Sequence, residues 1–216
     1  MKKIAVILAG CGVFDGAEIH EAVLTLLAIR KLGAEYTIFA PDKDQHHVMN
    51  HYTHKESAEN RNVLVESARI ARGKIKPLTG FIATDFDALI FPGGFGVAKN
   101  LCTFAFDGPD CVVDPSVELA IKSMLNARKP IGAMCISPVL LAKVISKQVK
   151  VTIGNDASTA AAIHKMNAEH QNTNHGEVVI DKNFKVVTTP CYMLDADILQ
   201  IQEGTENLVR AVLDLC

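Results

Sequence analysis

Cys135 is the residue of this sequence best placed to act as a nucleophile. It follows a short apolar run, residues 130–134, and precedes a helical pattern of apolar residues at 139–145. This order predicts a strand, a sharp turn and a helix, with backbone N–H groups at the helix start directed at the sulfur. A thiol there is expected to have a pKa below its usual value of about 8.5, and the thiolate is the nucleophilic form. A buried structural cysteine is the alternative interpretation.

Two glutamates near the start of the chain could exchange a proton with this cysteine. Glu18 and Glu21 are three residues apart, so they share a face at the start of a helix predicted over residues 17–32. A carboxyl group beside a thiolate must carry a proton, which requires a pKa raised by burial and by neighbouring negative charge. Alternatively, both acidic side chains only complement the positive end of the helix dipole.

A pair of glycines, Gly93 and Gly94, follows the apolar run at residues 87–92. Their unhindered N–H groups could approach a substrate oxygen. In open α/β sheets, ligands bind beyond the carboxyl ends of the strands. We therefore expect the glycine pair, the turn after the first strand and Cys135 to converge there.

Strand and helix patterns alternate along the whole chain, and no linker or composition break separates them. We expect one domain over residues 1–216: an α/β three-layer sandwich with a mainly parallel sheet. The histidine-rich segment 43–60 is predicted to be irregular or a hairpin, and residues 102–114 to be a loop. The expected strands cover residues 4–9, 36–40, 75–78, 87–92, 130–134 and 151–154 with a hairpin at 178–189, and the expected helices cover 17–32, 61–72, 115–125, 139–145, 157–166 and 196–213.

Composition and cysteine usage restrict the class of protein further. With 49% hydrophobic and 21% charged residues, a net charge of −2 and no basic stripe, the chain is not expected to bind nucleic acid or a membrane. No apolar stretch approaches the roughly 18 residues of a membrane span. The six cysteines form no C-x-x-C pair, which argues against a zinc ribbon or a disulfide scaffold and predicts a reduced, cytoplasmic protein.

Several segments together resemble the DJ-1/PfpI superfamily, and the resemblance spans nearly the whole chain. They are Gly-Ala-Glu-Ile-His-Glu at 16–21, Phe-Pro-Gly-Gly at 91–94, Gly-Ala-Met-Cys at 132–135, and the strands at 177–181 and 187–189. Residues 10–21 with 134–136 more narrowly resemble the enhancing-lycopene-biosynthesis proteins of bacteria. The resemblance implies a flavodoxin-like, class I glutamine amidotransferase-like fold, a glyoxalase activity, a link to isoprenoid biosynthesis and a homodimer.

Carried over residue by residue, the resemblance makes Cys135 the nucleophile and Glu21 its carboxylic partner. The N–H groups of Gly94 and Ile136 become the oxyanion donors. The implied substrate is a small dicarbonyl, glyoxal or methylglyoxal, which is converted to a hydroxy acid; the same chemistry could remove dicarbonyl adducts from amines. No cofactor is needed, because the substrate's own hydrogen moves. Many superfamily members with peptidase-like triads have histidine where this chain has Ile136, which argues against a protease.

Two other functions compete with this interpretation. The protein could be a redox-responsive or partner-binding protein whose Cys135 is oxidised. A glutamine amidotransferase is less favoured, because its His-x-Glu motif should follow a late strand. Here His175-Gly176-Glu177 precedes the strand predicted from residue 178. The position after the last predicted strand, where the motif should lie, reads Thr-Pro-Cys-Tyr at 189–192. Cys191 of this turn could line the site, although a structural thiol is favoured.

Two further motifs are not expected to bind anything. Gly10, Gly12 and Gly16, with Asp42 after the second strand, imitate a dinucleotide-binding turn, but the third glycine is one residue late. Four histidines could ligate zinc, yet no carboxylate or cysteine nearby completes the set, so we expect a solvated loop and no metal. They are His46, His47, His51 and His54.

Overall fold

The computed structural model describes residues 1–216 and contains one large sheet of parallel strands with a single antiparallel edge strand. The strands pair side by side in an order that places β1, β6 and β7 at the centre. In spatial order they are β10 (Val179–Asp181), β11 (Val186–Thr189), β7 (Ile131–Met134), β6 (Ala88–Phe91), β1 (Lys3–Ile7), β2 (Glu35–Ala40) and β5 (Ile75–Pro77). The predicted α/β sandwich with a mainly parallel sheet is confirmed.

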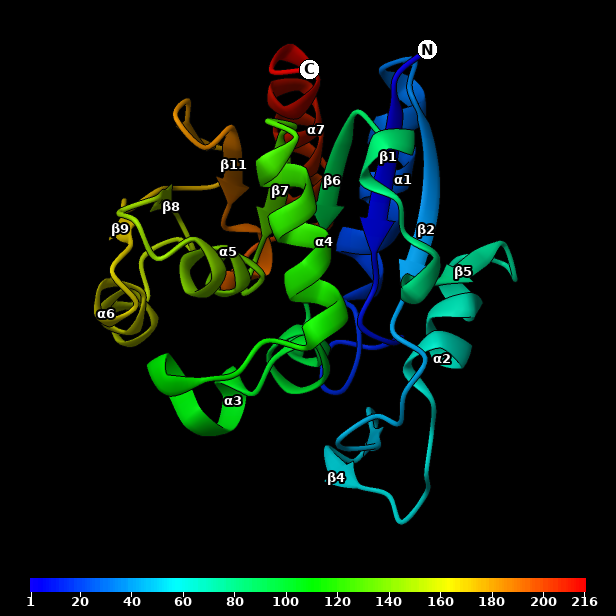
Figure 1. The fold of residues 1–216 in the computed structure, drawn as a ribbon. Coiled ribbons are helices and arrows are strands. Elements are labelled where there is room, and N and C mark those ends of the chain that lie inside the picture. Colours follow the sequence, from blue (N-terminus) through cyan, green and yellow to red (C-terminus); the bar gives the residue numbers. More distant parts are fainter.

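Helices cover both faces of this sheet (Figure 1). In that view α4 crosses in front of the strands, whereas α1 and α7 lie behind them and pack against each other. The helices are α1 (Ile19–Lys31), α2 (Val63–Ile70), α3 (Phe104–Asp107), α4 (Pro115–Asn126), α5 (Pro138–Ile145), α6 (Ala157–Lys165) and α7 (Ile198–Asp214). None of them combines the length and the hydropathy that crossing a membrane would require.

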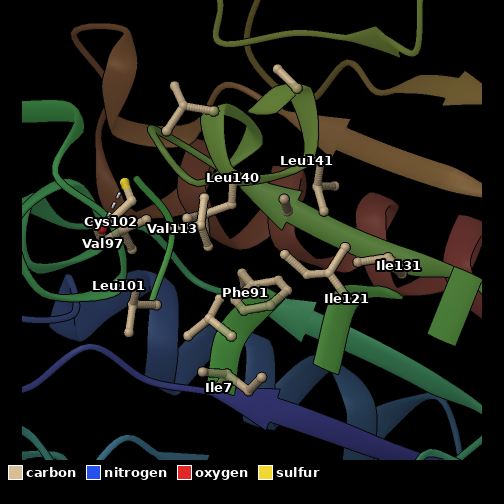
Figure 2. Packing of buried hydrophobic residues seen from close by; sticks show 14 of the residues in the cluster. Ile7, Phe91, Val97, Leu101, Cys102, Val113, Ile121, Ile131, Leu140 and Leu141 are labelled. Carbon is tan, nitrogen blue, oxygen red and sulfur yellow. Dashed lines mark hydrogen bonds between the residues drawn. The ribbon is translucent and has the colours of Figure 1, made fainter. Parts of the chain in front are cut away.

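The buried strands explain why two apolar cores form. Along β1 and just after it, Ile4, Val6 and Leu8 pack into the core beneath α1 and α7, while the alternate residues Ala5, Ile7 and Ala9 pack into the core on the other face. Side chains alternate across a strand, so a run that is apolar at every position must be covered on both sides. Figure 2 shows the second core, where Phe91 of β6 lies among side chains of β1, α4 and α5.

The short elements differ more from the sequence prediction than the long ones. The histidine-rich segment forms a hairpin, β3 (Met49–Asn50) with β4 (Lys55–Glu56), which was one of the two expected outcomes. The predicted strand at 151–154 is only β8 (Lys150–Val151), which pairs with β9 (Glu169–His170) outside the main sheet. The loop prediction for 102–114 was wrong in part, because α3 is a helical turn too short to show a period.

Candidate active site

Cys135 lies in a sharp turn directly after β7 and before α5. Its φ is +59°, in the left-handed region, and its N–H donates to the carbonyl of Thr189 at 3.1 Å. The Ser137 hydroxyl donates to the Pro92 carbonyl at 2.7 Å and so ties the turn to the end of β6. A non-glycine residue in this conformation is costly and persists only when its surroundings hold it. A strained strand-to-helix turn of this kind presents the nucleophile in α/β-hydrolases.

Glu21 lies in the first turn of α1 and its side chain enters the same site. It is 0% exposed. Its Oε2 accepts from the N–H of Gly93 at 2.9 Å, its Oε1 accepts from the N–H of Tyr192 at 3.1 Å, and its carboxyl group is hydrogen-bonded to Cys135. The turns after β6, β7 and β11 therefore meet around one buried carboxyl group.

Glu18 has a different role from the one that helical spacing suggested. The helix predicted from residue 17 begins at Ile19, and Glu18 is its N-cap. The Glu18 carboxylate accepts from the N–H of Glu21 at 2.7 Å, and the Glu18 N–H donates to the Gly93 carbonyl at 2.9 Å. Of the two glutamates, Glu21 is the one that is hydrogen-bonded to Cys135, whereas Glu18 caps the helix that carries it.

The environment of Glu21 keeps this carboxyl group protonated. Burial, and then repulsion from the Glu18 carboxylate, raise the pKa of Glu21 to about 8. The N–H groups of Tyr192 and Gly93 and the Cys135 side chain act in the opposite direction, but they do not cancel the cost of burial. Glu21 therefore holds a proton at neutral pH, and the raised carboxyl pKa expected from the sequence is present.

The Cys135 thiol differs from the sequence prediction. Burial, and then the charge of Glu21, raise the pKa of Cys135 well above its usual value, whereas the N–H groups of Gly94 and Ile136 lower it. The prediction of a depressed thiol pKa was therefore wrong, because it counted the helix end and omitted the desolvation of a side chain that is only 7% exposed. The cysteine and the carboxyl group share protons, so they titrate as a pair.

The two predicted oxyanion donors lie at this pair. The N–H groups of Gly94 and Ile136 both point at the Cys135 sulfur. Gly94 has a φ of +104°, and a Cβ at this position would overlap the main chain of Gly16 and Glu18. This turn therefore requires glycine, both for its backbone conformation and for the close approach of two loops. The structure thus brings all four residues that the resemblance named into one site.

Gly93 lies against the side chains of both Cys135 and Glu21. A Cβ at Gly93 would overlap the Cβ of Cys135 and lie 2.5 Å from Oε2 of Glu21 and 2.8 Å from the Cys135 sulfur. The absence of a side chain here therefore lets the thiol and the carboxyl group meet.

A cavity of about 470 Å³ opens above the Cys135 sulfur. Its wall combines the turns after β6, β7 and β11 with α3 and the start of α6, and it is mostly apolar. The lining residues are Val13, Gly94, Phe95, Ala98, Phe104, Ala105, Cys135, Ile136, Asp156, Thr159, Tyr192 and Met193. Glu21 is not among them, so it reaches the site from beneath the cavity floor.

Sequence reasoning missed the residues that shape this cavity. Phe104 was assigned to a loop, and Tyr192 was noted only as part of the turn after the last strand. Besides its N–H bond to Glu21, Tyr192 forms a 2.8 Å hydrogen bond from its hydroxyl to Nδ1 of His20. No local pattern marks such residues, because strand order, and not sequence proximity, brings them to the sulfur.

The remaining candidates lie elsewhere or serve the fold. Cys191 is buried beneath the turn after β11, close enough for the charges of Glu21 and Cys135 to affect it, but it does not line the cavity. Glu177 accepts from the N–H of Asn174 in the loop before β10, outside the cavity. All six cysteines are free thiols.

The glycine turn and the histidines pack against each other. A Cβ at Gly12 would lie 2.5 Å from the His51 ring, whose Nε2 accepts from the N–H of Phe14 at 3.2 Å. His46 and His47 pack against Phe106. No group of three or more potential metal-ligating side chains is close enough to hold an ion. The hairpin's own side chains therefore cover the turn that imitates a dinucleotide site.

The sheet order and the cysteine turn define a class I glutamine amidotransferase-like α/β protein, and comparisons with known proteins agree. No model of a known protein family matches the chain. It is 48% identical to the ES1 protein homolog, mitochondrial, of Rattus norvegicus over 99% of this chain and 84% of the relative. Glutamine amidotransferase-like class 1 domain-containing protein 3, mitochondrial, of Homo sapiens is 48% identical over 99% of this chain and 83% of its own length. The chain belongs to this ES1 family.

Solved structures show the same relationship. The crystal structure of an isoprenoid biosynthesis protein with an amidotransferase-like domain from Ehrlichia chaffeensis superposes with a TM-score of 0.92 at 36% identity, covering 99% of this chain and 100% of that one. Glyoxalase III from Candida albicans superposes with a TM-score of 0.63 at 14% identity, covering 99% and 97% of the two chains. At that identity the second comparison shows a shared fold.

The relatives also correct the predicted location. Both relatives that are 48% identical are named as mitochondrial proteins, which contradicts the cytoplasmic location inferred from cysteine usage. Free thiols indicate a reducing environment, and this property does not distinguish one reducing compartment from another.

Proposed function

We propose that the protein converts a small α-oxoaldehyde to a 2-hydroxy acid without a cofactor, with Cys135 as the nucleophile and Glu21 as the proton shuttle. The observation that carries this proposal is the hydrogen-bonded pair itself: a thiol at the floor of a cavity beside a fully buried carboxyl group whose pKa is raised to about 8. A carboxyl group whose pKa is close to neutral pH can both donate and accept a proton during turnover.

In the first step the pair reacts in its singly protonated form, after one proton has left to solvent, with the remaining proton on Glu21, and the thiolate of Cys135 attacks the aldehyde carbon. A carbon–sulfur bond forms, and the electron pair of the carbonyl moves to oxygen. The N–H groups of Gly94 and Ile136, which point at the sulfur, stabilise this oxyanion, and Glu21 donates its proton to it. The product is a hemithioacetal, and Glu21 is left as a carboxylate.

In the second step Glu21 transfers the former aldehyde hydrogen. As a carboxylate it removes the proton from the carbon bound to sulfur, which gives an enediolate. A proton passes from the oxygen on that carbon to the neighbouring oxygen, and Glu21 returns its own proton to the neighbouring carbon. The resulting thioester is hydrolysed by water, which releases the hydroxy acid and restores the thiol. The reaction is an internal oxidation and reduction of the substrate, so the overall balance needs only water.

Product analysis tests this function. Purified protein is incubated with methylglyoxal, and lactate is measured by NMR against the Cys135→Ser variant as the matched control. We expect lactate to form catalytically with the wild type and only at the background rate with the variant. In D₂O, deuterium at C2 of the product would report exchange at the shuttling carboxyl group. Equal lactate formation by the two proteins would overturn the proposal.

The two competing functions have less structural support. Glutaminase chemistry needs a histidine base after β11, and the turn there provides Pro190, Cys191 and Tyr192. A redox-responsive role uses the same Cys135 thiolate, whose formation burial opposes in both functions, but it has no use for the buried carboxyl group of Glu21. Removal of dicarbonyl adducts from amines would use the same Cys135 and Glu21 side chains. A glycated amine can therefore be assayed alongside methylglyoxal.

We propose in addition that the protein is a homodimer. Ile19, Val23 and Leu27 recur every fourth residue along α1 and are 43%, 46% and 47% exposed. An apolar stripe on one helical face suits an isologous interface with a second copy. Light scattering should give a dimer mass for the wild type and a monomer mass for Val23→Glu. Leu119→Glu on α4, at another exposed apolar position, is the control; a monomeric wild type would refute the proposal.

A further inference from the structure

The cavity above Cys135 is larger than the smallest dicarbonyls require. Its volume of about 470 Å³ falls in the range of roughly 300–1,000 Å³ that accommodates drug-sized ligands. Glyoxal and methylglyoxal, with two and three carbon atoms, would leave most of this space to water. A substituent that fills it would gain from the removal of apolar surface from water.

The wall of the cavity is apolar and aromatic. Nine of its twelve lining residues are hydrophobic. Phe95 from the turn after β6, Phe104 from α3 and Tyr192 from the turn after β11 bring three aromatic rings from separate segments of the chain. Phe95 is 52% exposed, so its ring is accessible to a ligand in the cavity.

The charge of the lining selects against anions. It contains no lysine, arginine or histidine, and Asp156 is its only aspartate or glutamate. The Asp156 carboxylate caps α6 by accepting from the N–H of Thr159 at 2.7 Å, and hydrogen bonds from Thr159 and Ser158 lower its pKa. The lining itself therefore carries one negative charge, and this carboxylate already occupies the end of α6 where an anion could bind. The Lys99 ammonium lies outside the lining, 5.8 Å from the centre of the Phe95 ring, and donates to the carbonyl of Phe14.

We propose, on the basis of the function proposed above, that the preferred substrates are neutral α-oxoaldehydes with an apolar aryl or long alkyl substituent, and not glyoxal, methylglyoxal or anionic analogues. The substituent would lie between Phe95, Phe104 and Tyr192, and the aldehyde would face the sulfur. The overall reaction is the same as for methylglyoxal. R–CO–CHO and water give R–CH(OH)–COOH, and the aldehyde hydrogen moves to the neighbouring carbon.

The test compares initial rates for matched probes. Wild-type kcat/KM is measured for phenylglyoxal, 2-oxooctanal, methylglyoxal and 4-carboxyphenylglyoxal, which is close in size to phenylglyoxal but anionic. We expect both apolar substrates to exceed methylglyoxal by about ten-fold or more, as differences in apolar contact typically allow. The carboxylated probe should be about five-fold poorer than phenylglyoxal, a modest effect because the charge is partly solvated.

Three variants connect these preferences to the cavity. Phe104→Ala should lower kcat/KM for phenylglyoxal about ten-fold while changing methylglyoxal little. Phe106→Ala, on the same helical turn but outside the lining, is the matched control and should change neither. Asp156→Asn keeps a good N-cap and should narrow the gap between phenylglyoxal and its carboxylated analogue.

The outcomes separate the two proposals. Methylglyoxal turnover with a kcat/KM equal to or above that of the apolar substrates overturns the substrate preference and leaves the proposed function in place. Equal effects of Phe104→Ala and Phe106→Ala on phenylglyoxal overturn it as well. Failure of the wild type to exceed Cys135→Ser on every substrate overturns both proposals.

Discussion

The backbone N–H of Tyr192 donates a 3.1 Å hydrogen bond to Oε1 of Glu21, across 171 residues of sequence. It joins the turn after the last parallel strand to the first turn of α1. The other carboxyl oxygen is held by the N–H of Gly93, so two main-chain donors orient the group toward Cys135. Substituting the side chain of Tyr192 would leave its main-chain donor in place. The role of the carboxyl group is therefore tested by substituting Glu21 itself.

Replacing Cys135 by serine should abolish turnover and keep the fold. A serine hydroxyl is hardly ionised near neutral pH, so we expect kcat/KM to fall by a factor of about 10³ or more. Circular dichroism should show an unchanged spectrum and a melting temperature within a few degrees of the wild type. Cys216→Ser, at an exposed cysteine, is the control and should retain activity. Comparable turnover by Cys135→Ser would refute the nucleophile.

Replacing Glu21 by glutamine should separate proton transfer from thiol reactivity. Glutamine keeps the size and can still donate a hydrogen bond to sulfur, but it cannot exchange a proton. We expect turnover to fall about 10²-fold or more while iodoacetamide still alkylates Cys135. Glu18→Gln preserves an N-cap acceptor and should retain most of the turnover. An inactive Glu18→Gln beside an active Glu21→Gln would show that the roles are reversed.

The reactivity of Cys135 should rise only in alkaline solution, above the pH at which an ordinary thiol ionises, because the pKa of this thiol is raised. The pKa of Glu21 is raised to about 8 and that of Cys135 is raised as well, so at lower pH the pair holds two protons and no thiolate. The rate of iodoacetamide alkylation measured from pH 6 to 10 should show this rise. In Glu21→Gln the midpoint should move to lower pH, because the charge of Glu21 raises the pKa of Cys135. A wild-type midpoint well below pH 7 would contradict this and would support the lowered thiol pKa predicted from the sequence.

Ionisation of Glu21 should lower the unfolding free energy of the protein at alkaline pH. Its pKa rises from 4.5 in a model compound to about 8 in the fold, so between these values the folded state binds a proton that the unfolded state has lost. Stability contributed by this group therefore falls as pH increases across that window. In urea titrations at pH 8, Glu21→Gln should be more stable than the wild type by at least about 1 kcal/mol, given roughly 1.4 kcal/mol per pKa unit. The measurement is repeated at pH 5. If the unfolding free energy of Glu21→Gln relative to that of the wild type is lower at pH 8 than at pH 5, the prediction is contradicted.

Adding one methyl group at Gly93 should disrupt the site. The new Cβ would overlap Cys135 and Glu21, so we expect Gly93→Ala to lose about 1–3 kcal/mol of unfolding free energy and nearly all activity. Gly80→Ala is the control, since a Cβ there meets no atom within 4 Å. A fully active Gly93→Ala would show that the thiol and the carboxyl group need not be in contact.

The order of strands and helices could be predicted from the sequence, because each long element carries its own period. The apolar runs of β1, β6 and β7 and the helical spacing of α1 and α4 are local properties that hydropathy reports directly. The turn at Cys135 was predictable for the same reason, since a strand meets a helix there. The single turn of α3 was not, because so few residues show no period.

The choice between Glu18 and Glu21 shows what spacing leaves open. Three residues on a helix place both side chains on one face, and only the resemblance to a known superfamily favoured Glu21. In the structure the helix begins one residue after Glu18, which turns that side chain into a cap and directs Glu21 inward. The starting residue of a helix depends on the contacts of the preceding turn, here the bond from the Glu18 N–H to Gly93.

Sequence alone therefore determined the class of fold, the nucleophile candidate and the turns that meet it, since these follow from periodicity and from the rule that parallel strands end at one edge. Tertiary structure decided the chemistry of the pair and the shape of the cavity. The pKa values of Cys135 and Glu21 depend on burial that many distant residues create together. Phe104 and Tyr192 face one sulfur because the strand order β11-β7-β6 brings their turns together, and that order is a property of the whole folded chain.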